Sequence, residues 1–352
     1  MAYYDGLFDA LGLRDWCGGG GAAAQAGAGD GPMTMAELLA RSRGEAVGVE
    51  RAWWDIPFPS LDTLNASCGT IWRSRDLTAW VADGFLSIKN GLKLVLDPLT
   101  QPLSWLLDGA LWAFLAVPWW VLTLILAAVV LVFTRSLAMT ISVTLALCFF
   151  AFIDYFDYAM QTLSVIFVCT LICVLLGVPI GIAMSKRDGL QRAVIPILDM
   201  LQTLPTFVYL IPLIFLFSVT ESKLYGIAII LYAIVPVIRL TNLGIRLVDK
   251  DVLEASDAFG MTARQRLFGV EMPLAMPTIM AGVNQTIMMA LAMVVIASLV
   301  SAPGLGVLVL RGIRNLELGV GLIAGFCIVI LAVILDRTSK AALSRVAKTS
   351  NG

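Results

Sequence analysis

A polar segment at residues 254–277 separates two apolar stretches, and its residue types suit binding rather than catalysis. It opens Glu254-Ala255-Ser256-Asp257-Ala258-Phe259-Gly260 and, nine residues later, closes Val270-Glu271-Met272-Pro273-Leu274-Ala275-Met276-Pro277. The pattern predicts two short helical pieces joined at Gly260, where the chain can approach a partner closely. We expect Pro273 and Pro277 to end the second piece. The alternative is an ordinary loop in which Gly and Pro are only punctuation.

The groups that most enzymes need are missing from the sequence. There is no histidine and no Gly-x-x-x-x-Gly-Lys-Ser/Thr loop, which argues against zinc proteases, histidine-based triads and an ATPase. Only Cys169 and Cys173 are close enough in sequence to share a metal, and no second pair completes a site. We therefore expect neither a metal nor a cofactor on this chain. An intramembrane enzyme would also need a nucleophile paired with a base.

A few polar residues interrupt the apolar stretches. Asp199 is costly in lipid, so it either lies in a translocation pathway or serves as a structural hydrogen-bonding residue or cap. Asn284 and Gln285, followed by Thr286, either hold helices together or line a pore. With Gln202 and Thr203, these residues are our candidates for the pathway: Asp199, Gln202, Thr203, Asn284 and Gln285.

The elements around these residues are those of a membrane protein. Hydrophobic residues make up 59% of the 352, charged residues 14%, and the mean hydropathy is +0.89. Soluble domains are about 45–50% apolar. A spanning helix needs about 20 mainly apolar residues. On this basis we expect an all-α protein with about seven spans, at 111–133, 137–153, 160–184, 194–219, 224–238, 278–300 and 318–335.

Orientation follows from the basic residues. One alternating set of loops contains Arg135, Lys186, Arg187, Arg192, Arg239, Arg246, Lys250, Arg264, Arg266, Arg337, Lys340, Arg345 and Lys348. The opposite set contains Lys223, Arg311 and Arg314. Short basic loops stay in the cytoplasm. The 254–277 segment and the C-terminus are therefore predicted inside, and the N-terminus outside.

The sequence divides into four regions. Residues 1–76 form a polar external tail, Gly/Ala-rich at 18–31 and carrying Trp53-Trp54, which we also considered as an aromatic cage for a quaternary ammonium ion. Residues 77–109 suggest amphipathic helices on the membrane surface. Residues 110–340 form the transmembrane region, with a cytoplasmic loop at 239–277, and 341–352 form a cytoplasmic tail.

The 254–277 spacing resembles the loop by which importer permeases of the ATP-binding-cassette (ABC) class grip their ATPase: Glu-Ala-Ala, three residues, Gly, nine residues, Ile-x-Leu-Pro. Ser256, Val270 and Met272 replace the usual Ala, Ile and Leu. Residues 197–210, 238–241 and 273–286 also resemble the permeases of bacterial glycine-betaine/proline-type (quaternary amine) ABC importers.

The resemblance implies a type I importer permease in the bacterial inner membrane that acts as a homodimer. Its partners would be two ATPase subunits, which carry ATP and Mg, and an external substrate-binding protein. The coupling residues would be Glu254, Ala255, Ser256, Ala258, Gly260, Gly269, Val270, Met272, Pro273 and Pro277. Glycine betaine, proline betaine, choline, carnitine and trimethylamine N-oxide are compatible substrates. A stand-alone secondary carrier or channel for a small polar solute is the alternative.

Overall fold

The computed structural model describes residues 4, 8, 10–12, 17 and 58–350, with side chains left aside at 66–67 and 342–350. The expected Gly/Ala-rich stretch at 18–31 and Trp53-Trp54 lie outside these residues. The chain forms two compact units, Met1–Leu92 and Lys93–Gly352. We describe each by itself.

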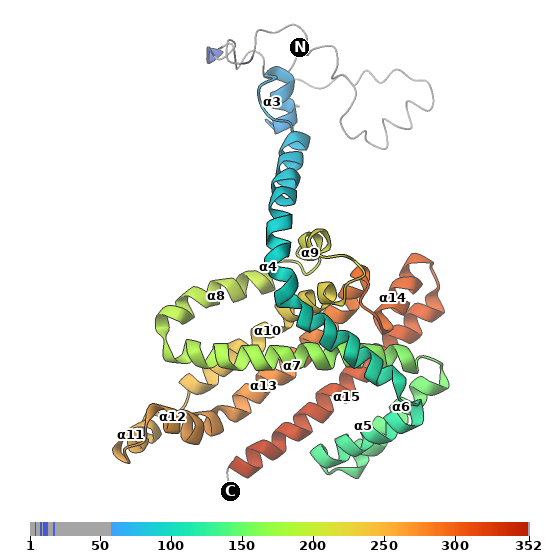
Figure 1. The fold of residues 1–352 in the computed structure, drawn as a ribbon, viewed down its shortest axis with the longest axis vertical. Coiled ribbons are helices and arrows are strands. Elements are labelled where there is room, and N and C mark those ends of the chain that lie inside the picture. The colour runs from blue at the N-terminus through green and yellow to red at the C-terminus, as the bar shows by residue number, and fades with distance from the viewer. Residues whose placement is uncertain (1–3, 5–7, 9, 13–16, 18–57, 351–352) are drawn as a thin grey trace. The chain divides into compact units, whose positions relative to one another are not determined.

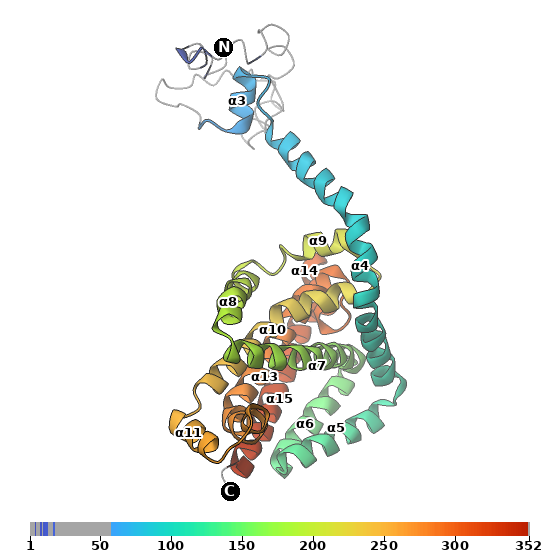
Figure 2. The same cartoon turned by 60° about the vertical axis from the view of Figure 1, so that its left-hand side comes forward.

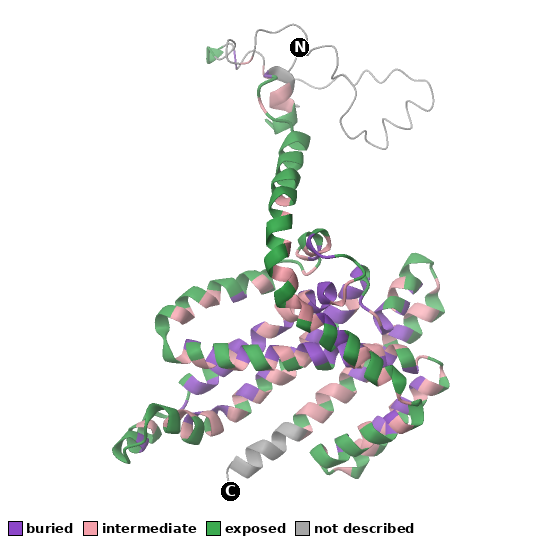
Figure 3. Ribbon diagram, viewed as in Figure 1, coloured by how far each residue is buried: buried purple, intermediate pink, exposed green. Residues whose placement is uncertain are grey.

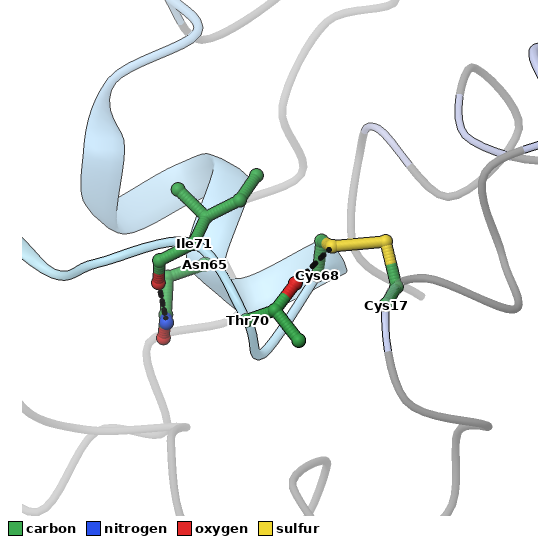
Figure 4. The surroundings of a disulfide bond; sticks show 5 residues. All are labelled: Cys17, Asn65, Cys68, Thr70 and Ile71. Carbon is green, nitrogen blue, oxygen red and sulfur yellow. Dashed lines mark hydrogen bonds between the residues drawn. A yellow bond between two sulfur atoms is a disulfide. The ribbon is translucent and has the colours of Figure 1, made fainter.

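The first unit contains α3 (Leu61–Ser67) and the start of α4 (Ser74–Ala116). The disulfide Cys17–Cys68 ties the end of α3 to a residue 51 positions earlier (Figure 4). Asp62 accepts hydrogen bonds from the Ser74 backbone at 2.9 Å and from the Ser74 hydroxyl at 2.6 Å, and these bonds lower the pKa of its carboxyl. Instead of several amphipathic helices over 77–109, the structure has one helix of 43 residues, α4.

The second unit is built of helices throughout its described length (Figures 1 and 2). After α4 they are α5 (Trp119–Thr134), α6 (Leu137–Phe152), α7 (Phe156–Lys186), α8 (Asp188–Thr203), α9 (Leu210–Leu216), α10 (Ser222–Arg246), α11 (Lys250–Ala258), α12 (Ala263–Arg266), the π-helix η2 (Leu267–Glu271), α13 (Met272–Ala297), the 3₁₀ turn η3 (Ser298–Val300), α14 (Leu305–Arg314) and α15 (Leu318–Ser350).

Within the described residues, four helical segments are long and apolar enough to cross a membrane: Phe156–Lys186, Ser222–Arg246, Ala263–Val300 and Leu318–Ala341. A fifth candidate is the pair α4 and α5, which is bent by 110° where Pro118 precedes α5. The apolar helix α6 is shorter, with 16 residues. The spanning candidates lie at five of the seven expected spans, and α6 lies at a sixth, 137–153, although it is shorter than the others.

The expected span at 194–219 is not one helix. Its first part belongs to α8, which ends at Thr203, and its second part to α9, which begins at Leu210. The break falls at Leu204, an extended residue directly before Pro205. A proline disfavours the helical conformation in the residue that precedes it, so the apolar run bends there despite its hydropathy.

The core of the second unit lies where α10 packs against α7 and α13 (Figure 3). Small residues let the backbones approach, as is common between membrane helices. A Cβ on Gly181 of α7 would lie 2.6 Å from the Cβ of Thr241 and 2.8 Å from the carbonyl oxygen of Ile238, both on α10. Cys169 and Cys173 are buried on this face of α7, where their thiols contact the carbonyls of Gly226 and Ile230 on α10.

The two ends of the second unit differ in what they contain. In both Figure 1 and Figure 2, α11 and α12 lie at the same end as the last turns of α15, and α9 and α14 lie at the other. The predicted cytoplasmic segments, 254–277 and the end of the C-terminal helix, therefore lie at the same end of the unit.

Candidate functional site

The polar segment folds as two helical pieces joined at Gly260, as predicted. Glu254, Ala255, Ser256 and Ala258 lie on α11, Gly269 and Val270 lie in η2, and Met272, Pro273 and Pro277 begin α13. Glu254, Ala255 and Ala258 are exposed, whereas Ser256 is buried and its hydroxyl donates to the Leu253 carbonyl at 2.7 Å. The serine at this position is thus accommodated within its own helix.

Gly260 has a conformational role that its sequence position alone did not reveal. Its φ is +74°, and the Gly260 and Met261 amides donate to the carbonyls of Asp257 at 2.9 Å and Ser256 at 3.2 Å. This pair of bonds is a Schellman motif, which closes the end of a helix with one left-handed residue. A Cβ at Gly260 would meet no other atom of the chain within 4 Å. Inside this chain, glycine is required by its φ and not by crowding.

The second piece begins at a capping box. The Thr262 hydroxyl accepts from the Gln265 amide at 3.4 Å, and the Gln265 side chain accepts from the Thr262 amide at 2.9 Å. Such a reciprocal pair satisfies donors that a helix start would otherwise leave unpaired. The turn and the second helix are therefore both fixed by short-range contacts.

Pro273 and Pro277 do not end the second piece, contrary to the sequence prediction. The helix runs from Ala263 to Val300 as one candidate span. Pro273 lies in the first turn of α13, and the wide π-turn before it brings the Met272 amide to the Leu267 carbonyl. Proline has no amide donor to pair, and Pro273 falls where the π-turn passes into the α-helix. The change from π to α geometry there lets the chain continue.

The joint between the pieces exposes large apolar side chains. Phe259 is 85% exposed, and Met261 and Phe268 are also exposed. Together with Gly260, Gln265 and Gly269 they line a hollow, which we call the loop hollow. Exposed apolar patches rimmed by polar residues mark interaction sites. The arrangement can receive an apolar side chain from a partner.

A buried carboxylate in this segment was missed by the sequence analysis. The side chain of Glu271 is 2% exposed and forms ion pairs with Lys186 at the end of α7 and, at 3.2 Å, with Arg266 of α12. Arg266 also holds both oxygens of Asp257 on α11, at 2.6 and 2.7 Å. A lone acid between Val270 and Met272 was the available signal. Its partner Lys186 lies 85 positions away, so the pairing could not be read from the sequence.

The structure places the pathway candidates in different surroundings. Asp199 on α8 pairs with Arg239 on α10. The Asn284 amide donates to Asp336 at 3.1 Å and its oxygen accepts from Ser339, so Asn284 joins α13 to α15. Thr203 donates to the Met200 carbonyl within its own helix at 3.3 Å. Asn284 thus acts as a helix contact, the first of its two alternatives.

Gln202 and Gln285 belong to a common face. The Gln202 amide contacts the Met289 sulfur at 3.8 Å, and Gln285 lies one helical turn before Met289 on α13. Tyr209 contacts the sulfur of Met293, one turn further, at 3.7 Å. We call Gln202, Gln285 and Met289 the polar face. Both glutamines are exposed.

Comparison with known proteins shows which family this chain resembles. The family described as binding-protein-dependent transport system inner membrane component matches residues 174–348. The glycine betaine/proline betaine transport system permease protein ProW of Escherichia coli (strain K12) is 40% identical over 266 residues, which cover 75% of this chain and 74% of ProW. The glycine betaine transport system permease protein OpuAB of Bacillus subtilis (strain 168) is 42% identical, covering 73% of this chain and 86% of OpuAB.

Among solved structures, a chain of the MetNI methionine ABC transporter in an inward-facing conformation superposes with a TM-score of 0.49 at 20% identity, covering 55% of this chain and 95% of that chain. The sequence relatives are transport permeases and not enzymes. This chain belongs to the family of binding-protein-dependent transport system inner membrane components, as an all-α, multi-pass ABC importer permease.

Proposed function

We propose that this chain forms the membrane pathway of an ATP-driven importer for glycine betaine and related methylated amines. Proline betaine, choline, carnitine and trimethylamine N-oxide are the further members of this substrate class. The identity to permeases named for glycine betaine transport, at 40% and 42%, carries the proposal. In such importers the external binding protein is expected to select the substrate, so the polar face needs only to let a small polar solute pass.

The 254–277 segment is proposed as the docking site of the ATPase subunit. Its support is the loop hollow, because Phe259 lies exposed on a joint whose backbone is fixed by the Schellman motif and the capping box. Closing of two ATPase subunits on ATP and Mg would move α11 and α12 as a lever on α10 and α13. The membrane pathway would then open outward and receive substrate from the binding protein, and it would return to its first state after hydrolysis.

A second copy of the chain is proposed to complete the pathway. The polar face lies exposed in a single chain, although Gln285 is a polar group on the apolar helix α13 and Gln202 lies on the amphipathic helix α8. Polar groups in a membrane region face protein or a water-filled cavity. A two-fold dimer would enclose this face between two copies.

The N-terminal unit is proposed to lie outside and the C-terminus in the cytoplasm. Basic loops on the side of α11, α12 and the end of α15 support this orientation. The disulfide Cys17–Cys68 supports it independently, because disulfides persist in oxidising compartments outside the cytoplasm (Figure 4).

Purification of the chain from its native membrane tests the central proposal. We expect an ABC ATPase to copurify, and proteoliposomes to take up glycine betaine only with ATP, the ATPase and the binding protein. Uptake by the chain alone, without ATP, would instead establish a secondary carrier or channel. Calorimetry on the binding protein then identifies the substrate.

One variant links the docking proposal to the structure. Phe259→Ala removes a side chain that is 85% exposed, so the fold should be unaffected and the copurified ATPase should fall at least tenfold. Phe152→Ala, at an 88% exposed position on α6, is the matched control and should keep the ATPase. Equal retention by both variants would move the docking site elsewhere.

A further inference from the structure

Four charged residues form a neutral cluster where residues 254–277, which we call the coupling segment, meet α7. Glu271 is nearly fully buried and pairs with Lys186 and Arg266. Arg266 in turn donates hydrogen bonds to both carboxylate oxygens of Asp257. We call Asp257, Arg266, Glu271 and Lys186 the charge cluster. A carboxylate is costly to bury unless opposite charges and hydrogen bonds compensate it. Glu271 therefore depends on the positions of both cations.

The members of the charge cluster come from separate elements. Asp257 is on α11, Arg266 on α12, Glu271 at the end of η2, and Lys186 is the last residue of α7. The chain connects α11 directly to α10 and η2 directly to α13. In contrast, α7 is distant in sequence, and the pair Lys186–Glu271 gives it a direct polar contact with the segment.

The end of α7 is in turn fixed to α10. Arg246 donates to the Met184 carbonyl at 3.1 Å and to Asp188 at 2.6 Å. The close approach at Gly181 packs the same part of α7 against α10. A displacement of α11 and α12 that carries Glu271 along would therefore act on α7 as well as on the two helices that continue the segment.

The π-helix η2 places Glu271 where it can contact both Arg266 and the end of α7. A π-turn over Leu267–Glu271 inserts a wide turn between α12 and α13, and such turns are frequent at functional sites. It also allows Glu271 to face Arg266, five positions earlier. The carboxylate thus lies at the point where the coupling segment becomes a membrane helix.

We propose that Glu271 is a positioning residue for ATP-coupled transport, which transmits movement of the coupling segment to α7 through Lys186. The inference rests on the proposed function and adds a third membrane helix to the two that the segment joins. It assigns Glu271 a mechanical role and no contact with substrate or nucleotide.

The test uses the full complex of permease, ATPase and binding protein in proteoliposomes, with substrate molecules imported per ATP hydrolysed as the readout. Glu271→Gln keeps the shape and removes the charge, and should lower this ratio at least fivefold while ATPase copurification is unchanged. Lys186→Met should also lower the ratio, and the double variant should lose no more than Glu271→Gln alone, since that variant has already broken the Lys186–Glu271 contact. Lys186→Arg should keep the ratio.

Glu317→Gln is the control, because it removes another carboxylate that is paired with Arg311 at the opposite end of the unit. It should leave the ratio unchanged. Should Glu271→Gln fail to assemble, Lys186→Met decides, because the Lys186 side chain is 38% exposed and Glu271 keeps its ion pair with Arg266 in that variant. A wild-type ratio in the variant that assembles, or additive losses in the double variant, would overturn the proposal. A wild-type complex without ATP-driven uptake would instead refute the proposed function.

Discussion

At the scale of single residues, some residues of the coupling segment fix its backbone conformation and others present side chains for contact. Gly260 and Thr262 set the backbone through local hydrogen bonds, whereas Phe259 and Glu254 present side chains outward. The sequence motif contains one residue of each kind, Gly260 and Glu254, and it leaves out Thr262 and Phe259. The structure distinguishes them by their backbone hydrogen bonds and by their exposure. A residue that fixes the backbone can be replaced by one with the same φ preference, whereas a contact residue cannot.

Gly260 allows this distinction to be tested. Alanine at a φ of +74° should destabilise the turn by about 1–2 kcal/mol, whereas asparagine tolerates that conformation better. We expect the Gly260→Ala chain to reach the membrane, and its complex with the ATPase to hydrolyse ATP with reduced uptake. If backbone conformation is the requirement, Gly260→Asn should recover most of the uptake. Equal loss in both variants would show that the partner needs a bare backbone there, and normal transport in both would remove Gly260 from the coupling role.

The adjacent polar residues Asn284 and Gln285 should respond differently to substitution. Asn284→Leu breaks bonds to Asp336 and Ser339 and should lower the stability of the α13–α15 contact by about 0.6–2 kcal/mol. Gln285→Leu should leave the unfolding midpoint unchanged but reduce the uptake rate, because its side chain is on the polar face. Thermal unfolding in detergent and uptake in proteoliposomes measure the two effects. Reversed outcomes would place Asn284, and not Gln285, in the pathway.

At the scale of elements, the sequence predicts what depends on local composition. The helical pieces around Gly260 and six apolar helices follow from short-range patterns, and they appear in the structure. The break at Leu204 was missed because an average hydropathy does not weigh the effect of Pro205 on the residue before it. Glu271 was missed for another reason, since its burial depends on Lys186, which only the packing of α7 brings near.

Packing between α7 and α10 gives a prediction at this scale. Gly181→Ala would place a Cβ 2.6 Å from that of Thr241, so the two helices must separate. We expect a loss of about 1–3 kcal/mol and an unfolding midpoint lower by several degrees. Gly325→Ala on α15 is the control, because a Cβ there meets no atom within 4 Å. An unchanged midpoint in Gly181→Ala would show that the backbone contact relaxes freely.

At the scale of the whole molecule, the chain joins a disulfide-closed unit to a membrane unit. Cysteine usage agrees with this division: Cys17 and Cys68 are bonded in the first unit, and the free cysteines Cys148, Cys169, Cys173 and Cys327 are on helices of the second. The sequence analysis did not predict this disulfide, because nothing between Cys17 and Cys68 indicates that they meet.

The disulfide makes the orientation testable without a reporter domain. In a chain whose four free cysteines are replaced by serine or alanine, a membrane-impermeant maleimide should label intact cells or spheroplasts only after an impermeant reductant has opened Cys17–Cys68. The additional variant Cys17→Ser frees Cys68, which should then react from outside without reduction. Because both thiols leave the oxidised pair together, the first labelling should add two groups per chain and the second one. Labelling that requires permeabilised cells would place this unit in the cytoplasm and would overturn its proposed orientation.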